Sequence, residues 1–572
     1  MGFELLGLGQ DLESRLGSEA AHALGKSEGS QSARHGREAE SKGGARRGPR
    51  SGYPRAAAIG MKFLRDRFLL ALALGGILSA CGESPAPGGS DSSTQESSAP
   101  LRADERPNIL IFLMDTQRAD YLGMYGHEAP TSPSLDAFAE ESLVFDRAFA
   151  PASSTSPSHA SLFTSTYPRI HGVWNRVPRG EDEEPIFPAL SQRAITLAEV
   201  LAEVGYQTAA IADGGNLQEN RGFAQGFQTW DSKFLGADNR VDRALQWLDQ
   251  ERKPDQPFFL FLHTYQVHTP YVPAPEHVER FADPNYQGPL RAAWQGARDH
   301  WVANLGMKGA IRKLQGDYYR PALPEEGEFP EPEDLRFLQA LYQAEIRQMD
   351  TAFGRLIGEL KARGIDRSNT LFLLTSDHGE EFWEHGKYGH HQIYESTAHI
   401  PFLVQGPGTV TGRRADPVDL LDVMPTLLYW GGLDADSLPP SMLGRVLDFG
   451  TTDPAAAHTI IGESNWPEHQ LSWREGERKA MFFPDSERAP EVYELAQDPG
   501  EKQDLASRQA AWLEAIQPAK QAWEDKAADW QLEHQLAPGV RDWKRLSEEE
   551  RNLMIDLGYV DPEEFADESD GD

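Results

Sequence analysis

The sequence is short of cysteine. Only one of its 572 residues is a cysteine. A single thiol excludes a framework of intramolecular disulfides, and it excludes a zinc site built from cysteine ligands. Whatever chemistry the chain performs is therefore expected to rest on other side chains.

Basic side chains are also in the minority. Lys and Arg number 55 against 89 Asp and Glu, which gives a formal net charge of −34 at pH 7. A polyanion is repelled by a surface of this sign. We therefore expect no nucleic acid partner, whereas the acidic surface favours solubility and attracts cations.

The chain has little that could span a membrane. The apolar run 68–79, FLLALALGGILS, is too short to cross a bilayer comfortably. A short basic segment, 61–67, precedes it, and Leu78-Ser79-Ala80-Cys81 overlaps its end. This arrangement resembles a bacterial lipoprotein signal, which implies lipidation of Cys81 as the new N-terminus. The alternative is a buried apolar patch with an inert thiol.

The N-terminal segments follow from this interpretation. Residues 61–81 are the expected signal peptide and lipidated cysteine, and 82–105 are a polar linker. Residues 1–60 show no sustained hydrophobic period, which predicts disorder or a start assigned too far upstream of Met61. The mature protein is expected to be exported, as an outer-membrane or periplasmic lipoprotein or at the cell surface, and Gly82 favours the outer membrane.

From Arg106 onward the chain alternates between apolar runs and amphipathic stretches. Helices are expected at 196–204, closed by Gly205, and at 337–361, closed by Gly364. The expected strands are 108–114, 207–212, 257–262, 370–374 and 400–404. Strands that alternate with helices predict an α/β fold with a mostly parallel sheet covered on both faces.

The remaining regions break this pattern. The stretch 273–334 is rich in Pro, Trp, Tyr and charge, and we expect an insertion that shapes access to a site. A catalytic domain is thus expected over 106–432. A small antiparallel subdomain is expected over 433–515, with strands at 459–462, 479–483 and 491–495, and a helical, acidic tail over 516–572.

Polar side chains gather at the predicted strand ends and in the loops after them. They are Asp115, Thr155, His268, Asp377, His378 and His390. Ligands bind beyond the carboxyl ends of parallel strands. Two carboxylates, an imidazole and a hydroxyl suit one divalent cation with an alcohol nucleophile beside it. Taken singly, each residue also fits a helix cap or a loop hydrogen bond.

Several segments together resemble the sulfatases of the alkaline phosphatase superfamily. They are RPNILIFLMDTQRADYLGMYG (106–126), STSPSHASLFTS (154–165), LAEVGYQTAA (201–210), HTYQVHTPYVP (263–273), TSDHGEEFWEHG (375–386), IYESTAHIPFLVQGPG (393–408) and VYELAQDPGEKQDLA (492–506). The resemblance implies a three-layer α/β/α core with a small C-terminal antiparallel sheet.

The resemblance also implies roles for the residues that match. Asp115, Asp377 and His378 are metal ligands, and Thr116 stands where the family usually has a second aspartate ligand. His268 is expected to contact the ester oxygens or the leaving group. His390 stands where related enzymes offer a proton donor to the leaving group, and its neighbour His391 is an alternative.

The run 152–165, ASSTSPSHASLFTS, departs from the family at its reactive position. At the place of Pro157, sulfatases typically have a proline with Cys or Ser two residues before it and Arg two residues after it. They oxidise the Cys or Ser to formylglycine. Here Thr155 and His159 stand in those places. Threonine is a secondary alcohol, so no formylglycine is expected, and Thr155 is expected to attack as an alkoxide, with Ser154 in reserve. Alternatively, the hydroxyl groups of this run only cap a helix.

A second departure removes the lysine that family members use to bind sulfate. The segment 212–216 replaces the expected Gly-Lys-Trp-His, which leaves His159 and Asn216 as the candidate substrate-binding residues. A threonine sulfate could only be released by slow direct hydrolysis, so the site leans towards phosphoester or phosphonate chemistry. The imidazole of His378 shifts the expected metal from calcium towards manganese, magnesium or zinc.

The sequence therefore predicts a metal-dependent hydrolase of sulfuric or phosphoric esters. Its substrate would be a small molecule or the ester of a glycan or lipid. Two alternatives stay open at this point. One is a transferase that passes the same group to an acceptor alcohol, and the other is a non-catalytic surface lipoprotein that binds an anionic glycan.

Overall fold

The computed structural model describes residues 106–175, 177, 186–233, 235–304, 314–325, 327–536 and 539–542. The expected segments 1–60, 61–81 with Cys81, and 82–105 lie outside the described residues, as does the predicted acidic tail beyond 542. Within the described ranges, no helix is both long enough and apolar enough to cross a membrane.

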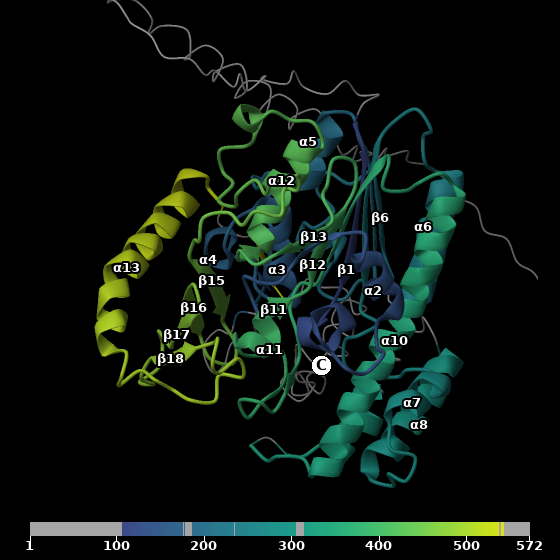
Figure 1. Ribbon diagram of the computed structural model, residues 1–572, viewed down its shortest axis with the longest axis vertical. Coiled ribbons are helices and arrows are strands. Elements are labelled where there is room, and N and C mark those ends of the chain that lie inside the picture. The colour runs from purple at the N-terminus through teal and green to yellow at the C-terminus, as the bar shows by residue number, and fades with distance from the viewer. Residues whose placement is uncertain are drawn as a thin grey trace, which may run out of the picture. The chain divides into compact units, whose positions relative to one another are not determined.

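A sheet of eight strands forms the centre of the fold (Figure 1), in the order β13-β2-β12-β8-β1-β7-β5-β6. β12 runs antiparallel to both of its neighbours, and the other neighbouring pairs are parallel. The strands are β1 (Asn108–Met114), β2 (Leu143–Phe145), β5 (Gln207–Ala212), β6 (Thr229–Ser232), β7 (Phe258–Thr264), β8 (Thr370–Thr375), β12 (Phe402–Gln405) and β13 (Gly412–Arg414).

The central strand β1 shows why the sheet could be read from the sequence. All seven of its side chains are buried. Leu110 and Phe112 face one hydrophobic core, and Ile109 and Ile111 face the other. Because both faces of a parallel sheet are covered, such a strand is a continuous apolar run rather than an alternating one.

Helices cover both faces of the sheet, which confirms the predicted three-layer α/β/α architecture. Figure 1 shows α6 and α10 on one side and α3, α5 and α12 on the other. The first layer contains α2 (Pro133–Ala139), α6 (Ala237–Gln250) and α10 (Pro332–Ala362). The second contains α3 (Thr155–Thr164), α4 (Pro168–His171), α5 (Leu197–Glu203) and α12 (Val423–Trp430).

Helix α5 begins and ends at the predicted signals. The Thr196 side chain accepts a hydrogen bond from the Glu199 amide, and the Glu199 carboxylate accepts one from the Thr196 amide. This reciprocal capping box satisfies two amides that the first helical turn leaves unpaired. At the other end Gly205 has φ 99°, which a residue with a side chain rarely adopts.

The predicted insertion after β7 is helical and precedes α10. It contains α7 (Pro275–Phe281), α8 (Pro289–Asn304), η4 (Leu314–Tyr319) and η5 (Arg320–Ala322). The helices α7 and α8 pack against α10. The proposed role of this insertion in access to a site stays a prediction.

The C-terminal region forms a separate sheet of four antiparallel strands. These are β15 (Ile460–Ser464), β16 (Gln470–Glu475), β17 (Arg478–Phe482) and β18 (Glu491–Glu494), with α13 (Ala510–Glu533) packed on them through Trp512 and Ile516. At the sheet edge, the Glu463 amide donates to the Pro151 carbonyl oxygen (2.9 Å), four residues before Thr155. The C-terminal sheet is thus tied to the loop before α3.

Shorter elements complete the described chain. They are η1 (Ala119–Tyr121), η2 (Gly123–Tyr125), β3 (Ala148–Phe149), β4 (Ile186–Ala189), η3 (Glu219–Arg221), β9 (Glu381–Phe382), β10 (Tyr388–Gly389), α11 (Glu395–Ala398), β11 (His399–Ile400), β14 (Val418–Asp419), η6 (Leu420–Asp422), η7 (Ala435–Ser437) and β19 (Gly539–Asp542).

Helix α2 depends on a residue far away in the sequence for its N-terminal cap. The buried Asp350 side chain, on α10, accepts hydrogen bonds from the amides of Ser134 (2.9 Å) and Leu135 (2.8 Å). We predict that Asp350→Ala lowers the free energy of unfolding by about 1–3 kcal/mol, because the buried Leu135 amide and the partly buried Ser134 amide lose their acceptor. Chemical denaturation measures this loss. The control is Asp242→Ala, which removes only a surface ion pair with Arg355 and should change stability by less than about 1 kcal/mol.

Candidate active site

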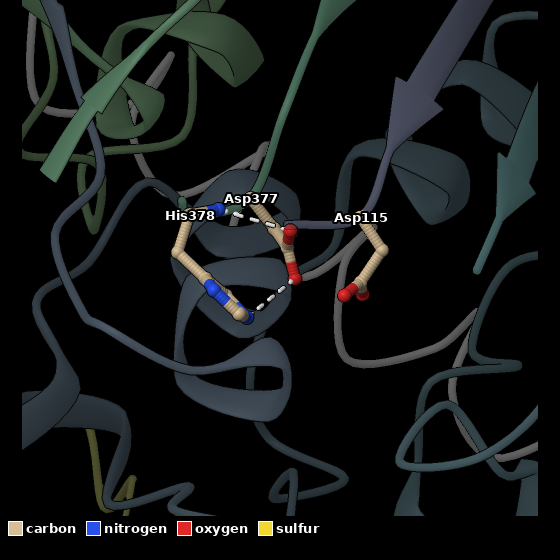
Figure 2. Close-up of side chains that lie close together, drawn as sticks. All are labelled: Asp115, Asp377 and His378. Atoms are coloured by element: carbon tan, nitrogen blue, oxygen red, sulfur yellow. Dashed lines mark hydrogen bonds and ion pairs between the residues drawn. The ribbon is translucent and has the colours of Figure 1, made fainter. Parts of the chain in front are cut away.

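The candidate site lies at the carboxyl ends of β1 and β8, which are parallel neighbours in the sheet. Asp115 follows β1 directly, and Asp377 and His378 follow β8 after one intervening residue. Figure 2 shows the two carboxylates and the imidazole converging from these two strand ends. One ligand atom from each of the three residues lies within 4.8 Å of the other two, and all three are buried.

The hydrogen bonds fix which atoms of this group are available to a ligand. The His378 Nδ1–H donates to the Gly379 carbonyl oxygen (2.9 Å), so Nε2 carries the free lone pair. Asp377 Oδ1 accepts from the amides of Thr116 (3.2 Å) and His378 (2.9 Å). No described residue donates a hydrogen bond to Asp377 Oδ2 or to Asp115 Oδ1. Asp115 Oδ1, Asp377 Oδ2 and His378 Nε2 are therefore the atoms that a ligand can reach.

The electrostatics of the group indicate a cation. Burial raises the pKa of Asp115 well above its usual value, and burial together with the charge of Asp115 does the same for Asp377. Burial lowers the pKa of His378 well below its usual value, so the imidazole is neutral. Two carboxylates can both be ionised here only if a positive charge lies between them. Oxygen and neutral imidazole donors of this kind fit a divalent cation.

Thr116 lies beside this group in a strained conformation. Its φ of 56° is rare for a β-branched residue. The hydroxyl of Tyr342, on α10, holds it by donating to the Thr116 carbonyl oxygen (2.7 Å). The Thr116 Oγ1 atom is buried and has no hydrogen-bond partner among the described residues. Backbone strain of this kind is typical of functional sites. The role of Thr116 as a metal ligand stays a prediction.

Thr155 is the first residue of α3, in the second helical layer. Its side chain contacts Asp115 and His378. Its Oγ1 lies 3.4 Å from Asp115 Oδ2 and 3.5 Å from His378 Nε2. Two nearby hydroxyls have other partners, since Ser156 Oγ accepts from Arg221 (2.7 Å) and Ser158 Oγ donates to the Ala152 carbonyl oxygen (3.0 Å). The positive end of the α3 dipole stabilises negative charge at this position.

The predicted substrate-binding residues are His159, on α3, and Asn216, in the loop after β5. His159 is buried one helical turn after it, with Nδ1 2.8 Å from the Thr155 carbonyl oxygen and 3.5 Å from Asp377 Oδ2. Burial holds the pKa of His159 well below its usual value. Asn216 accepts a hydrogen bond from Arg221 (2.8 Å), which also contacts Ser156. Both residues therefore lie near the predicted nucleophile.

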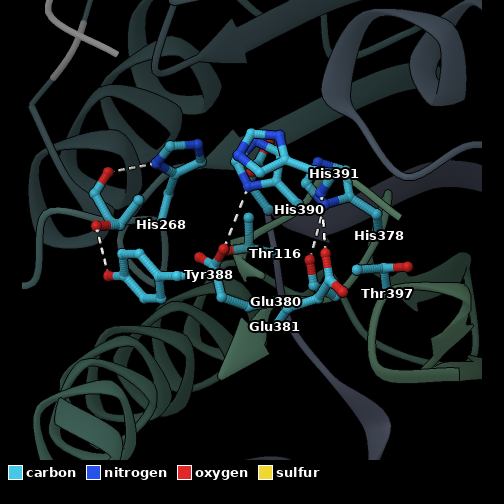
Figure 3. A network of polar contacts seen from close by, with 12 residues as sticks. Thr116, His268, His378, Glu380, Glu381, Tyr388, His390, His391 and Thr397 are labelled. Atoms are coloured by element: carbon cyan, nitrogen blue, oxygen red, sulfur yellow. Dashed lines mark hydrogen bonds and ion pairs between the residues drawn. The ribbon is translucent and has the colours of Figure 1, made fainter. Parts of the chain in front are cut away.

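His268 and His390 lie beside His378, in contact through their rings. The His390 ring lies between the rings of His268 and His378, with centroids 5.0 and 4.7 Å away (Figure 3). Nδ1 of His390 lies 3.2 Å from Oε1 of the buried Glu380. Burial lowers the pKa of both His268 and His390 to about 4. The alternative residue His391 lies farther out, with its ring 5.8 Å from that of His390.

Three buried residues near the site were not predicted. His263, on β7, directs Nε2 to Asp115 Oδ2 (3.2 Å). Asp213 accepts from the Leu235, Gly236 and Tyr265 amides and the Thr264 hydroxyl. Arg221 joins Asn216 to Ser156. Asp213 carries the same signal as Asp115, an acidic residue directly after a buried strand, whereas no local pattern marks Arg221.

Comparison with known proteins assigns the fold and the family. The chain is 23% identical to N-acetylglucosamine-6-O-sulfatase of Bacteroides thetaiotaomicron over 509 residues, covering 74% of this chain and 88% of that protein. It is 24% identical to an arylsulfatase of Clostridium perfringens over 471 residues, covering 70% and 90%.

Solved structures share the fold. One is an enzyme in complex with D-glucosamine-2-N,6-O-disulfate, with a TM-score of 0.59 and 19% identity over 74% of this chain and 98% of that one. The phosphonate monoester hydrolase of Agrobacterium radiobacter has a TM-score of 0.55 and 20% identity over 76% and 100%. A sequence model described as "Sulfatase" matches residues 107–433. Because this match spans more than half of the chain, the chain belongs to the sulfatase family of ester hydrolases.

Proposed function

We propose that this protein is a metal-dependent hydrolase of sulfuric or phosphoric esters that uses Thr155 as its nucleophile. One observation carries the proposal. The Thr155 hydroxyl lies within 3.5 Å of both Asp115 and His378, in a buried group in which Asp115 Oδ1 and Asp377 Oδ2 have no donor among the described residues. A helix-capping hydroxyl would have no need of such surroundings.

Asp115, Asp377 and His378 would hold the cation, with Thr116 as a further ligand. A divalent ion bound there polarises an ester oxygen and lowers the pKa of a neighbouring hydroxyl. The neutral imidazole favours manganese, magnesium or zinc, although calcium stays a candidate.

The remaining steps belong to the side chains of this chain. Thr155 Oγ1 attacks the sulfur or phosphorus, and its proton moves towards Asp115 Oδ2. The ester bond to the leaving oxygen breaks, and His268 or His390 assists that oxygen with a hydrogen bond or a proton. Water then cleaves the threonine ester and restores the hydroxyl. His159 and Asn216 would position the anionic group next to Thr155.

The class of ester follows from the threonine. A secondary alcohol cannot become formylglycine, so a covalent intermediate must be released by direct attack of water. We propose that phosphodiesters or phosphonate esters are preferred for this reason, as the name of one structural neighbour, phosphonate monoester hydrolase, allows. Other neighbours are described with sulfated glycans, among them a 2-O glycosaminoglycan sulfatase. A glycan or lipid ester is therefore the proposed natural substrate.

Replacing Thr155 tests the nucleophile. We predict that Thr155→Ala lowers kcat by at least about 1,000-fold, as removal of a nucleophile does, while circular dichroism and metal content stay those of the parent. The control is Ser158→Ala on the same helix, which removes a hydroxyl bonded only to backbone and should keep turnover. Full activity of Thr155→Ala would move the nucleophile to Ser154 or elsewhere.

A rate panel tests the metal and the ester class together. Protein stripped with EDTA is assayed on an aryl sulfate, a phosphate monoester, a phosphodiester and a phosphonate monoester, each with calcium, magnesium, manganese or zinc. We expect no turnover before a metal is added, and the highest kcat/KM on the phosphodiester or phosphonate. If the aryl sulfate is best, the threonine performs sulfatase chemistry without formylglycine, and the proposed ester class is wrong.

We further propose export and lipidation at Cys81, in keeping with the sequence from Met61 to Cys81. When the full-length gene is expressed in a bacterial host labelled with radioactive palmitate, we expect the label on the processed protein that begins at Cys81, in the membrane fraction. Cys81→Ser should abolish the label, because no other thiol exists in the chain. A labelled Cys81→Ser protein, or an unlabelled parent, would contradict the anchor.

A further inference from the structure

His263 is a buried histidine at the carboxyl end of β7, next to β1 in the sheet. It is paired with Leu113 in the parallel register, so its ring lies beside the strand end that carries Asp115. Its ring contacts those of Tyr265 and His159, with centroids 4.8 and 5.1 Å away. A ring enclosed in this way has one orientation.

The hydrogen bonds of His263 also fix its tautomer. The Asp213 amide donates to Nδ1 (3.4 Å), so Nδ1 is the acceptor and Nε2 carries the hydrogen. That Nε2–H points at Asp115 Oδ2, 3.2 Å away. Asp213 is itself held by donors from two loops, which makes the donor to Nδ1 rigid.

This contact determines which oxygen of Asp115 faces a ligand. Oδ2 accepts from His263 and from the Thr155 hydroxyl. Oδ1 has no donor among the described residues. With one oxygen held at a fixed place, the carboxylate can neither rotate nor turn its other oxygen away from the converging atoms of Asp377 and His378.

We infer that His263 is the positioning residue of the metal centre, which aims Asp115 Oδ1 at the cation. The inference rests on the proposed metal-dependent function. A neutral imidazole that donates one hydrogen bond adds no charge to the site. The hydrogen bond removes rotational freedom from Asp115 before a metal binds. Loss of a residue that orients a metal ligand in this way typically weakens metal affinity by about 10- to 100-fold.

Three substitutions separate the hydrogen bond from the shape of the side chain. His263→Gln can place an amide N–H where Nε2 lies, whereas the shorter amide of His263→Asn cannot reach Asp115. His263→Leu keeps volume without a donor. The matched control is His171→Leu, because His171 is equally buried but its ring nitrogens bond the Ser161 hydroxyl and the Val173 amide rather than a carboxylate.

The readout is binding of Mn²⁺ or Ca²⁺ alone to the metal-free protein, measured by isothermal titration calorimetry without substrate. We expect the Kd to rise about 10- to 100-fold in His263→Asn and His263→Leu, and to stay close to the parent value in His263→Gln and His171→Leu. Circular dichroism verifies that each variant is folded.

Two outcomes would overturn the inference, and they differ from failure of the proposed function. If His263→Asn binds Mn²⁺ as tightly as the parent, or His263→Gln binds as weakly as His263→Asn, His263 does not act through its Nε2–H. If the parent binds none of Mn²⁺, Ca²⁺, Mg²⁺ or Zn²⁺, the metal centre and the role of His263 fall together.

Discussion

Two carboxylates buried side by side are the constraint on which this structure depends. Asp115 and Asp377 are fully buried at the ends of adjacent strands; burial raises the pKa of both, and the charge of Asp115 raises that of Asp377 further. Neither could be retained in a core for stability alone, since apolar residues would fill the space at lower cost. Neighbouring groups fix one oxygen of each carboxylate: His263 donates to Asp115 Oδ2, and the Thr116 amide donates to Asp377 Oδ1. The neutral imidazole of His378 directs the lone pair of Nε2 towards the two carboxylates.

The sheet topology brings these groups together from distant parts of the chain. Parallel pairing of β1 with β8 and with β7 places Asp115, Asp377 and His263 at one edge. Thr155, the proposed nucleophile, lies at the start of α3 in the second layer, and its hydroxyl contacts Asp115 at the end of the sheet. Long apolar strands fix these positions, which leaves the loops free to vary around a rigid centre.

Much of this arrangement could be predicted from the sequence, and the limit of prediction is physical. Continuous apolar runs marked β1, β5, β7 and β8, and the acidic residues after them marked the site. By contrast, β16 was missed because its run, QLSWRE, mixes apolar and polar residues. His263 and Asp350 act through hydrogen bonds to residues more than 100 positions away, and no local pattern records such a contact.

The hydrogen bond between Glu463 and Pro151 has a consequence for biogenesis. The loop that leads into α3 is made early in synthesis, but β15, the strand that braces it, is made long afterwards. A nascent chain that has reached residue 433, where the match to the family model ends, still lacks this brace. The hydrogen bond that joins this loop to β15 therefore forms only after Glu463 has been synthesised, so a product truncated before residue 463 lacks it.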